Sequence, residues 1–284
     1  MTNILDRIAD ATRRRVAQEE AHISLGELKL LCKAAEYGSS KLGQGKRFTD
    51  ALAKPGLSLI CEAKKASPSK GIISPDFPYL AIAHEYEAAG ADAISCLTEP
   101  EWFLGTDKIF RDIRRSVDAP MLRKDFTVSE YQIYQARLMG ADAVLLICSL
   151  LDDEHLQSYL ELTHELGMAA LVEAHDEREV EQALQADARI IGVNNRKLAD
   201  FSVDFENAGH LRSLVGDDRL FVAESGVSVE QDIARIAHMK ADAALVGEAL
   251  MRSKDRTETL AAFRKAARLD LSRMQETTDP GVRP

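Results

Sequence analysis

The amino-acid sequence predicts an α/β protein of the (β/α)8 TIM-barrel class with an N-terminal helical extension. Two observations lead to this prediction. After Pro55 and Gly56, short apolar segments of strand length alternate with helical patterns of about 10 to 15 residues, which is typical of repeated βα units. A Gly-Ala-Asp-Ala sequence, with Lys in place of Gly in one copy, also recurs at three junctions between a predicted helix and the next strand.

The N-terminal segment shows helical periodicity. Apolar residues recur on one face around Ile4 and Ile8, and a second apolar set surrounds Leu28. The pattern changes to short strands only after residue 50. The chain is therefore expected to divide into a helical extension at 1–50, a barrel at 51–270 and a polar C-terminal tail at 271–284.

The predicted strands are nearly continuous apolar runs, as expected for a parallel sheet whose outer face is covered by helices. Their spacing is roughly 26 residues, close to the ~30 expected of a barrel unit. An open, doubly wound sheet is the alternative, but residues 66–71 lack its Gly-rich first turn. The eight runs are Leu57–Ala63, Ala93–Leu97, Pro120–Lys124, Ala143–Cys148, Ala169–Glu173, Ile190–Asn194, Leu220–Glu224 and Ala243–Val246.

Composition excludes several classes of function. The 284 residues include 36 Lys and Arg against 46 Asp and Glu, a net charge of −10 that argues against a nonspecific nucleic-acid or membrane-surface binder. The most apolar stretch, Ala143–Leu151, is about half the ~18 residues of a membrane span, so we expect a cytoplasmic protein. Because the 4 cysteines and 7 histidines are scattered, we predict neither a disulfide framework nor a metal site.

Polar residues interrupt the predicted strands where an active site is expected, at their carboxyl ends. Side chains alternate along a strand, so Glu62 and Lys64 share one face, as do Lys124 and Phe126. Buried together at one rim, such charges are unfavourable unless they act jointly, and their protonation is expected to be coupled. The other strand ends contribute Glu173, Asn194 with Arg196, and Glu224 with Ser225, whereas Lys65, Lys70 and Arg123 are expected to be solvated.

A phosphate site is predicted beside these residues. The loops after the seventh and eighth strands contain Gly226 and Gly247, which let backbone amides approach an anion, as barrel phosphate sites require. Ser67 follows the first strand, and Ser225 precedes Gly226. Glu248 would repel a phosphate with its side chain, so only its backbone N–H is assigned to this site.

These residues and their order resemble the indole-3-glycerol-phosphate synthase family. The resemblance spans the chain and is carried by Glu-Ala-Lys-Lys-Ala-Ser-Pro-Ser-Lys-Gly at 62–71, Leu-Thr-Glu-Pro at 97–100 with Phe-Leu-Gly at 103–105, Leu-Arg-Lys-Asp-Phe at 122–126, Leu-Val-Glu at 171–173, Gly-Val-Asn-Asn-Arg at 192–196 and Ala-Glu-Ser-Gly at 223–226. It implies closure of 1-(2-carboxyphenylamino)-1-deoxyribulose 5-phosphate to indole-3-glycerol phosphate with loss of CO₂ and water. No cofactor is implied.

The resemblance also implies roles. Lys124 is the expected general acid, Lys64 pairs with the substrate carboxylate, and Glu173 is the expected general base. Which lysine acts in which step stays open. Glu62, Asn194 and Glu224 would position the substrate hydroxyls and the lysines. The phosphate would be bound by Ser225, Gly226, Gly247 and Ser67, and Arg196 would act through Asn194 or the rim loop. Phe126 and Phe103 would enclose the aromatic ring, Leu145 and Ile147 would either join them or belong to the core, and the extension would cover the barrel mouth.

Three other readings stay open. A Schiff-base barrel aldolase would also place a lysine at a strand end. A phosphoribosylanthranilate isomerase would need a Cys and Asp pair at strand ends, but Cys61 faces away from its neighbour Glu62. A noncatalytic barrel that binds a phosphorylated metabolite would not need both an acid and a base. In each case the expected partner is a small phosphorylated molecule, and the chain is expected to be a monomer with a single activity.

Overall fold

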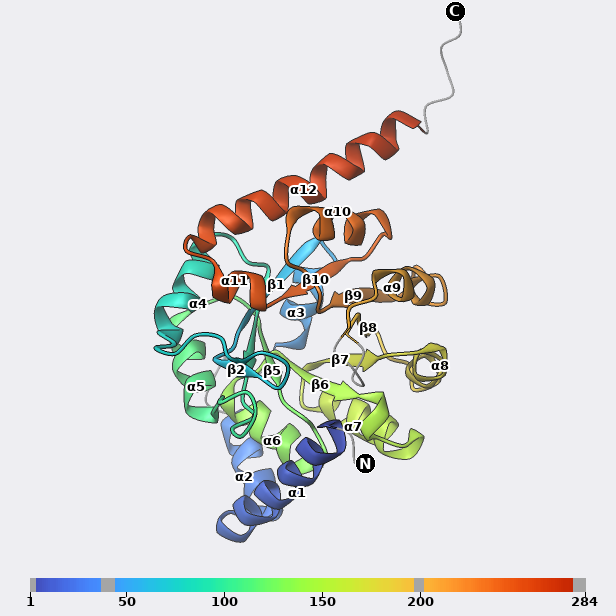
Figure 1. The fold of residues 1–284 in the computed structure, drawn as a ribbon. Helices are drawn as coiled ribbons and strands as arrows, with labels where there is room; N and C mark the ends of the chain where they lie inside the picture. The colour runs from blue at the N-terminus through green and yellow to red at the C-terminus, as the bar shows by residue number, and fades with distance from the viewer. Residues whose placement is uncertain (1–3, 37–43, 197–201, 278–284) are drawn as a thin grey trace, which may run out of the picture.

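The computed structural model describes residues 4–36, 44–196 and 202–277, and within them eight parallel strands close into a barrel (Figure 1). The predicted fold class is confirmed, and the strand boundaries differ from the predicted ones by at most one residue. The strands are β1 (Ser58–Ala63), β4 (Ala93–Leu97), β5 (Met121–Lys124), β6 (Ala143–Ile147), β7 (Ala169–Ala174), β8 (Ile190–Asn194), β9 (Leu220–Glu224) and β10 (Ala243–Val246), with β1 closing the barrel between β10 and β4.

Helices surround the barrel, and polar caps begin most of them. The side chains of Thr106, Ser129, Asp152, Asp176 and Asp204 each accept a hydrogen bond from a backbone N–H of the first turn, which satisfies donors that have no partner within the helix. The outer helices are α4 (Tyr79–Ala88), α5 (Asp107–Ser116), α6 (Glu130–Met139), α7 (Asp153–Glu165), α8 (Glu177–Gln185), α9 (Phe205–Arg212), α10 (Glu230–His238) and α12 (Arg256–Thr277).

Short elements decorate the carboxyl ends of the strands. The 3-10 helix η1 (Cys148–Leu150) follows β6, and α11 (Glu248–Arg252) follows β10. A small antiparallel hairpin of β2 (Ala66–Ser67) and β3 (Gly71–Ile72), which the sequence did not indicate, lies after β1. These elements rise around the mouth of the barrel.

The recurrent Asp in the helix–strand turns has a structural role. Asp92, Asp142 and Asp242 each accept a hydrogen bond from an N–H in the first two residues of an earlier, adjacent strand: Leu59 at 2.9 Å, Met121 at 2.8 Å and Phe221 at 2.7 Å. Each Asp therefore joins two neighbouring strands at the amino end of the barrel, and the repeated motif reflects this shared task.

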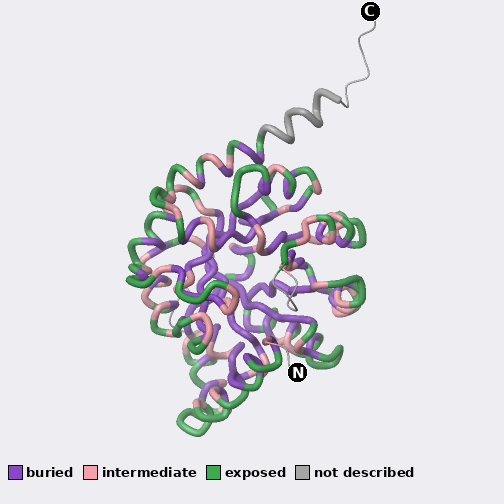
Figure 2. The backbone as a smooth tube through the Cα atoms, viewed as in Figure 1, coloured by how far each residue is buried: buried purple, intermediate pink, exposed green. Residues whose placement is uncertain are grey.

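Alternation along the strands produces two cores. Outward side chains such as Leu59 and Cys61 pack against the helices, whereas inward ones such as Ile60, Leu122 and Leu171 fill the barrel. Figure 2 shows buried residues along the strands and the inner sides of the helices. Because Cys61 belongs to the outer core, it cannot act at the barrel mouth.

The N-terminal extension contacts both ends of the barrel. Helix α1 (Ile4–His22) packs Leu5 and Ile8 beside the barrel interior near its mouth, and α2 (Leu25–Glu36) lies against α6. Helix α3 (Gly45–Leu52) inserts Phe48 and Leu52 beside the amino ends of the strands. The extension thus lines the mouth with one helix and closes the opposite end with another.

At the C-terminus, α12 packs against α10 and α4 (Figure 1). This helix continues to Thr277, into the range expected to be a tail, and residues 278–284 of that range lie outside the described residues. In the portion of the chain that the structure describes, no helix is both long and apolar enough to span a bilayer.

Candidate active site

Lys124 lies at the centre of the polar residues in the barrel mouth. Its Nζ donates to Oε2 of Glu173 and to Oε2 of Glu224, both at 2.8 Å. Burial alone would lower the pKa of Lys124, but the charges of Glu173, Glu224 and Glu62 outweigh it and raise that pKa above its usual value. The lysine is therefore held as an ammonium ion.

The two carboxylates that share Lys124 differ in their protonation. Burial would raise the pKa of Glu173, but Lys124 and His175 hold it well below its usual value. Burial, together with the charges of Glu173 and Glu62, raises the pKa of Glu224 to about 7 against the attraction of Lys124. Glu173 is thus the ionised member of the pair, while Glu224 titrates near neutrality.

A second ion pair joins Lys64 and Glu62, whose Nζ and Oε1 atoms lie 2.5 Å apart at the end of β1. Gly247 lies directly above this pair, and a Cβ at position 247 would overlap both side chains. Gly192 stands in the same relation to Oε1 of Glu224. The sequence predicted a role for the backbone amide of Gly247. It gave no indication that Gly192 must lack a side chain, because that requirement depends on which strand lies next to β8.

Asn194 orients the other oxygen of Glu173. Its Nδ2 donates to Oε1 of Glu173 at 3.1 Å, and its Oδ1 accepts from the backbone N–H of Arg196, also at 3.1 Å. The expected link between Arg196 and Asn194 is therefore present through the backbone of Arg196. Its guanidinium points elsewhere, toward Glu248, with Nη2 and Oε2 3.9 Å apart.

A cavity of about 1150 Å³ opens at this end of the barrel, and every residue predicted for the site lines it. One part is apolar: the rings of Phe103 and Phe126 lie 6.0 Å apart between centroids, near Leu145, and Leu5 of α1 joins the lining. The opposite part is bordered by Ser67, Ser225, Gly226, Gly247 and Glu248. The cavity therefore offers an apolar end, a charged centre and a polar end.

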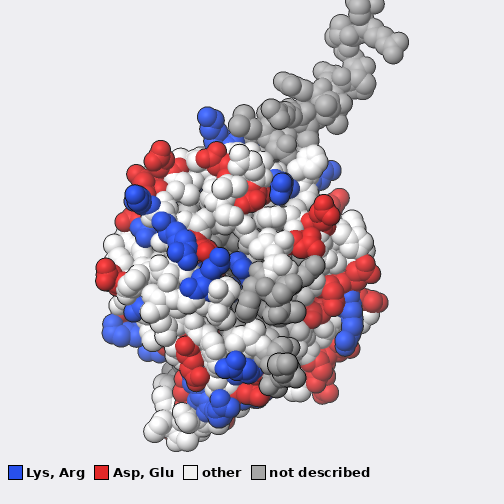
Figure 3. All heavy atoms as spheres, viewed as in Figure 1, with Lys and Arg blue, Asp and Glu red and all other residues white. Residues whose placement is uncertain are grey.

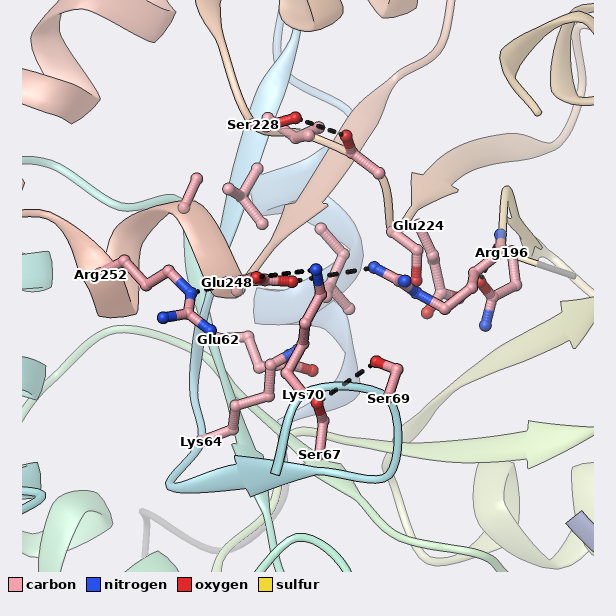
Figure 4. Close-up of a pocket in the computed structure, with 18 of the residues that line it drawn as sticks. Glu62, Lys64, Ser67, Ser69, Lys70, Arg196, Glu224, Ser228, Glu248 and Arg252 are labelled. Atoms are coloured by element: carbon pink, nitrogen blue, oxygen red, sulfur yellow. Dashed lines mark hydrogen bonds and ion pairs between the residues drawn. The ribbon is translucent and has the colours of Figure 1, made fainter. Parts of the chain in front are cut away.

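Cations gather around the polar end. Glu248 pairs with Arg252 (Nε to Oε1, 3.0 Å) and Lys70 (Nζ to Oε1, 3.6 Å) in addition to Arg196 (Figure 4). Figure 3 shows Lys and Arg side chains gathered near the middle of this face. The side chain of Glu248 thus organises three cations, a role beyond the backbone N–H assigned from sequence. Lys70 is partly exposed as expected, but it lies in the cavity wall.

Arg123 corrects one prediction. Its side chain is only 3% exposed, not solvated as expected. Its Nη1 donates to the carbonyl of Gln132 at 2.8 Å, and its Nη2 pairs with Asp107 at 3.1 Å and with Asp125 at 3.4 Å. The outward face of β5 is covered by helices, so a charge at this position has to be compensated by acidic neighbours. Asp125 follows two residues later, whereas Asp107 of α5 is brought near only by the fold.

Two further residues near the site were not identified from sequence. His175 contacts Glu173, and Arg15 of α1 reaches Asp125, the residue after Lys124. Alternation along the strand places His175 on the same face as Glu173, two residues earlier, so the sequence carried a signal for it. Arg15 and Asp125 are 110 residues apart, so local pattern carried no signal for their contact. Among the described residues, no group of three or more His, Cys, Asp or Glu side chains is placed to bind a metal ion.

Comparison with known proteins identifies the family. The family model for indole-3-glycerol phosphate synthase matches residues 5–263. A protein of that name from Ruminiclostridium cellulolyticum is 50% identical over 266 residues, covering 93% of this chain and all of that protein. Another, from Endomicrobium trichonymphae, is 48% identical and covers 90% of this chain and 98% of its own length.

Solved structures support the fold alone. The 3-hexulose-6-phosphate synthase of Salmonella typhimurium superposes with a TM-score of 0.62 at 12% identity, covering 75% of this chain and 100% of that one. At such identity the likeness says nothing about chemistry. The family model and the relatives at 48–50% identity give a more specific result: the chain belongs to the indole-3-glycerol phosphate synthase family.

Proposed function

We propose that this protein closes 1-(2-carboxyphenylamino)-1-deoxyribulose 5-phosphate to indole-3-glycerol phosphate, with loss of CO₂ and water, using the residues around Lys124. The observation that carries the proposal is the position of Lys124 between Glu173 and Glu224, in the centre of a cavity with one apolar and one cationic end. Those three regions fit the aromatic ring, the sugar carbons and the phosphate of that substrate.

In the condensation step, a ring carbon attacks the ribulose carbonyl and negative charge develops on its oxygen. Lys124 protonates this oxygen, because it is held as an ammonium ion at the centre of the cavity. Glu173 and Glu224 fix the direction of its N–H bonds through two 2.8 Å contacts. A positioned charge of this kind requires little reorganisation during the reaction.

The later steps use Lys64 and Glu173. Lys64 pairs with the carboxylate of the substrate, which leaves as CO₂, and then gives a proton to the departing hydroxyl. Glu173 takes up the proton lost as the indole ring becomes aromatic, because it is ionised and its two oxygens are already oriented by Lys124 and Asn194. Which lysine serves each step is left to the kinetics of the single variants.

At the polar end, the backbone amides near Gly226 and Gly247 and the hydroxyls of Ser67 and Ser225 bind the phosphate, with Arg196 supplying charge. Phe103 and Phe126 enclose the aromatic ring at the other end. We further propose that the protein acts in the cytoplasm on its small phosphorylated substrate, and that it is a monomer, as its single-barrel size favours. Light scattering after gel filtration would measure the mass in solution.

A Schiff-base aldolase is disfavoured by the same geometry. Such a lysine attacks as a free amine and needs a lowered pKa. In this cavity the carboxylates of Glu173 and Glu224 raise the pKa of Lys124 instead. Borohydride trapping with a carbonyl substrate should therefore leave no reduced adduct on Lys124.

The deciding experiment follows indole absorbance or fluorescence after the carboxyphenylamino-deoxyribulose phosphate is mixed with wild type and with Lys124→Met. Wild type should produce the indole signal, and the variant should lose roughly 10²–10⁴-fold in kcat while still binding inorganic phosphate. Lys108→Met, at an exposed lysine paired with Asp112, is the matched control and should keep full activity. Wild-type binding without an indole signal would contradict the proposal.

A further inference from the structure

His175 faces the proposed base from the end of β7. Its Nε2 is buried, forms no hydrogen bond with the described residues, and lies 3.4 Å from Oε1 of Glu173, an ion-pair distance. Its side chain is 16% exposed and that of Glu173 is 6% exposed. The Nε2 edge of the imidazole thus lies at ion-pair distance from the carboxylate that is proposed to act on the substrate.

The other side of the imidazole is held by α8. Nδ1 lies 2.9 Å from Oε2 of Glu179, and the same oxygen accepts the backbone N–H of His175 at 2.8 Å. Asn207 anchors the backbone further by donating to the carbonyl of His175 at 3.2 Å. These contacts fix the ring, so its orientation toward Glu173 does not depend on a flexible side chain.

Charge compensation explains why an imidazolium fits here. Among the described residues at the centre of the cavity, Glu62, Glu173 and Glu224 are paired with the two lysines Lys64 and Lys124. Burial alone would lower the pKa of His175, but contacts with Glu173 and Glu179 raise it to about 10. The ring is therefore positively charged at neutral pH and supplies a third cation.

We propose that His175, clamped by Glu179, is a positioning residue that keeps Glu173 ionised and oriented for proton abstraction. The inference rests on the role proposed above for Glu173. A charged ring on the side away from Lys124 leaves Glu173 with a cation at each oxygen, so the carboxylate keeps its charge when Lys124 turns to the substrate oxygen.

Several groups determine the pH dependence of this arrangement. Those facing Glu173 are Lys124 of β5, Asn194 of β8, Glu224 of β9 and His175 itself. Glu62 of β1 acts in turn on Lys124 and Glu224. Around His175, the further titratable groups are Glu179 of α8, its cap Asp176 and Cys148 of η1. The fall of kcat/KM at low pH therefore reflects the joint protonation of these carboxylates and not the pKa of any one of them.

The first test uses His175→Gln, which removes the charge but keeps an amide donor, and Glu179→Gln, which weakens the clamp without touching Glu173. Loss of the cation raises the pKa of Glu173, so the acidic limb of kcat/KM should move to higher pH, by about 1 unit in His175→Gln and by less in Glu179→Gln. His155→Asn is the matched control, since His155 also pairs with a carboxylate, Asp152, but on the exposed surface of α7.

A second measurement does not depend on turnover. In ¹⁵N spectra of wild type, the His175 signals, assigned by their loss in His175→Gln, should remain those of an imidazolium up to at least pH 8. In Glu179→Gln they should titrate at lower pH. A His175 that titrates near the ordinary value of about 6.5 would overturn the inference.

The two proposals can fail separately. If Glu173→Gln retains full turnover, the role of Glu173 is wrong and the inference falls with it. If Glu173→Gln is inactive while His175→Gln and Glu179→Gln both keep the wild-type pH profile, His175 is only structural and Glu173 keeps its role. Should His175→Gln fail to fold, the pH profile of kcat/KM in Glu179→Gln still decides.

Discussion

At the scale of single residues, one carboxylate in the barrel mouth serves the proposed reaction at a cost in stability. Glu224 is 1% exposed, and its Oε1 has no hydrogen-bond partner within the described residues. Such an oxygen is unfavourable to bury. Its other oxygen orients Lys124, which the proposed reaction requires. The protein therefore retains this carboxylate although its ionisation lowers the free energy of unfolding.

Glu224→Gln tests this opposition through the pH dependence of stability. In wild type the pKa of Glu224 is raised to about 7, so between about pH 4.5 and 7 the unfolded chain ionises there while the folded protein does not. The free energy of unfolding therefore falls as pH rises through this window. The variant has no ionisable group at this position, so its free energy of unfolding does not fall in this way. The difference in free energy of unfolding, variant minus wild type, should be larger at pH 8 than at pH 4.5 by roughly 2–3 kcal/mol.

Urea unfolding of both proteins at pH 4.5, 6 and 8 would measure the difference. A constant difference across this range would mean that Glu224 does not titrate there. Activity should fall in the same variant, because Lys124 would lose one of the two carboxylates that orient it. Higher stability with lower activity is the pattern expected of an active-site carboxylate.

Among the elements, α1 is held to the active site by one ion pair. Nη2 of Arg15 donates to Asp125 at 3.0 Å and 2.9 Å, and Asp125 directly follows Lys124. The same helix supplies Leu5 and Ile8 to the cavity lining. The position of α1 and the shape of the apolar end of the cavity are therefore linked through Arg15.

Arg15→Ala should lower the free energy of unfolding by about 1.5–3 kcal/mol, because it leaves the buried Asp125 with fewer charged donors. KM should rise more than kcat falls, since the loss affects the ring-binding wall and not Lys124. Arg13→Ala is the control on the same helix: Arg13 pairs with Asp10 where both side chains are more than half exposed, and its loss should change stability by less than about 1 kcal/mol. Equal effects of the two substitutions would refute the link.

Across the whole molecule, stability depends on closing both ends of the barrel. Helix α3 closes the amino end with Phe48 and Leu52, both fully buried. Gly45 begins this helix so close to the backbone of Met168 and Ala169 that a Cβ would overlap them. The segment before the first strand is thus part of the barrel core and not an appendage.

Phe48→Ala should destabilise the whole fold by about 3–5 kcal/mol, because it leaves a cavity beneath the strands. Thermal unfolding followed by circular dichroism and by fluorescence of Trp102, at the opposite end, should shift together. Lys46→Ala, at an exposed position of the same helix, should change stability by less than about 1 kcal/mol. A shift in only one of the two signals would show that α3 unfolds independently.

Local sequence pattern predicts most of the fold and which residues line the cavity. Period-two alternation within apolar runs places Glu62, Lys64 and Lys124 on the inner face, and repeated βα units bring all strand ends to one rim. The paired registers Leu97–Lys124, Ile147–Glu173 and Asn194–Glu224 then set these ends at one level. Such features follow from the chain's own periodicity and do not require knowledge of which residues touch.

The partners of each charge depend on the closed barrel. Lys124 and Glu224 are 100 residues apart, and the hydrogen bond between them exists only because eight strands close into a ring. The same is true of Arg123, whose burial depends on the helices packed outside β5. It is also true of Glu248, which meets Lys70 and Arg196 from other loops in addition to Arg252 of its own helix. Sequence by itself determined the fold class and which side chains face the mouth, because alternation and repeat are local. Tertiary structure decided which charges pair and how their pKa values shift, because burial and distance are properties of the assembled barrel.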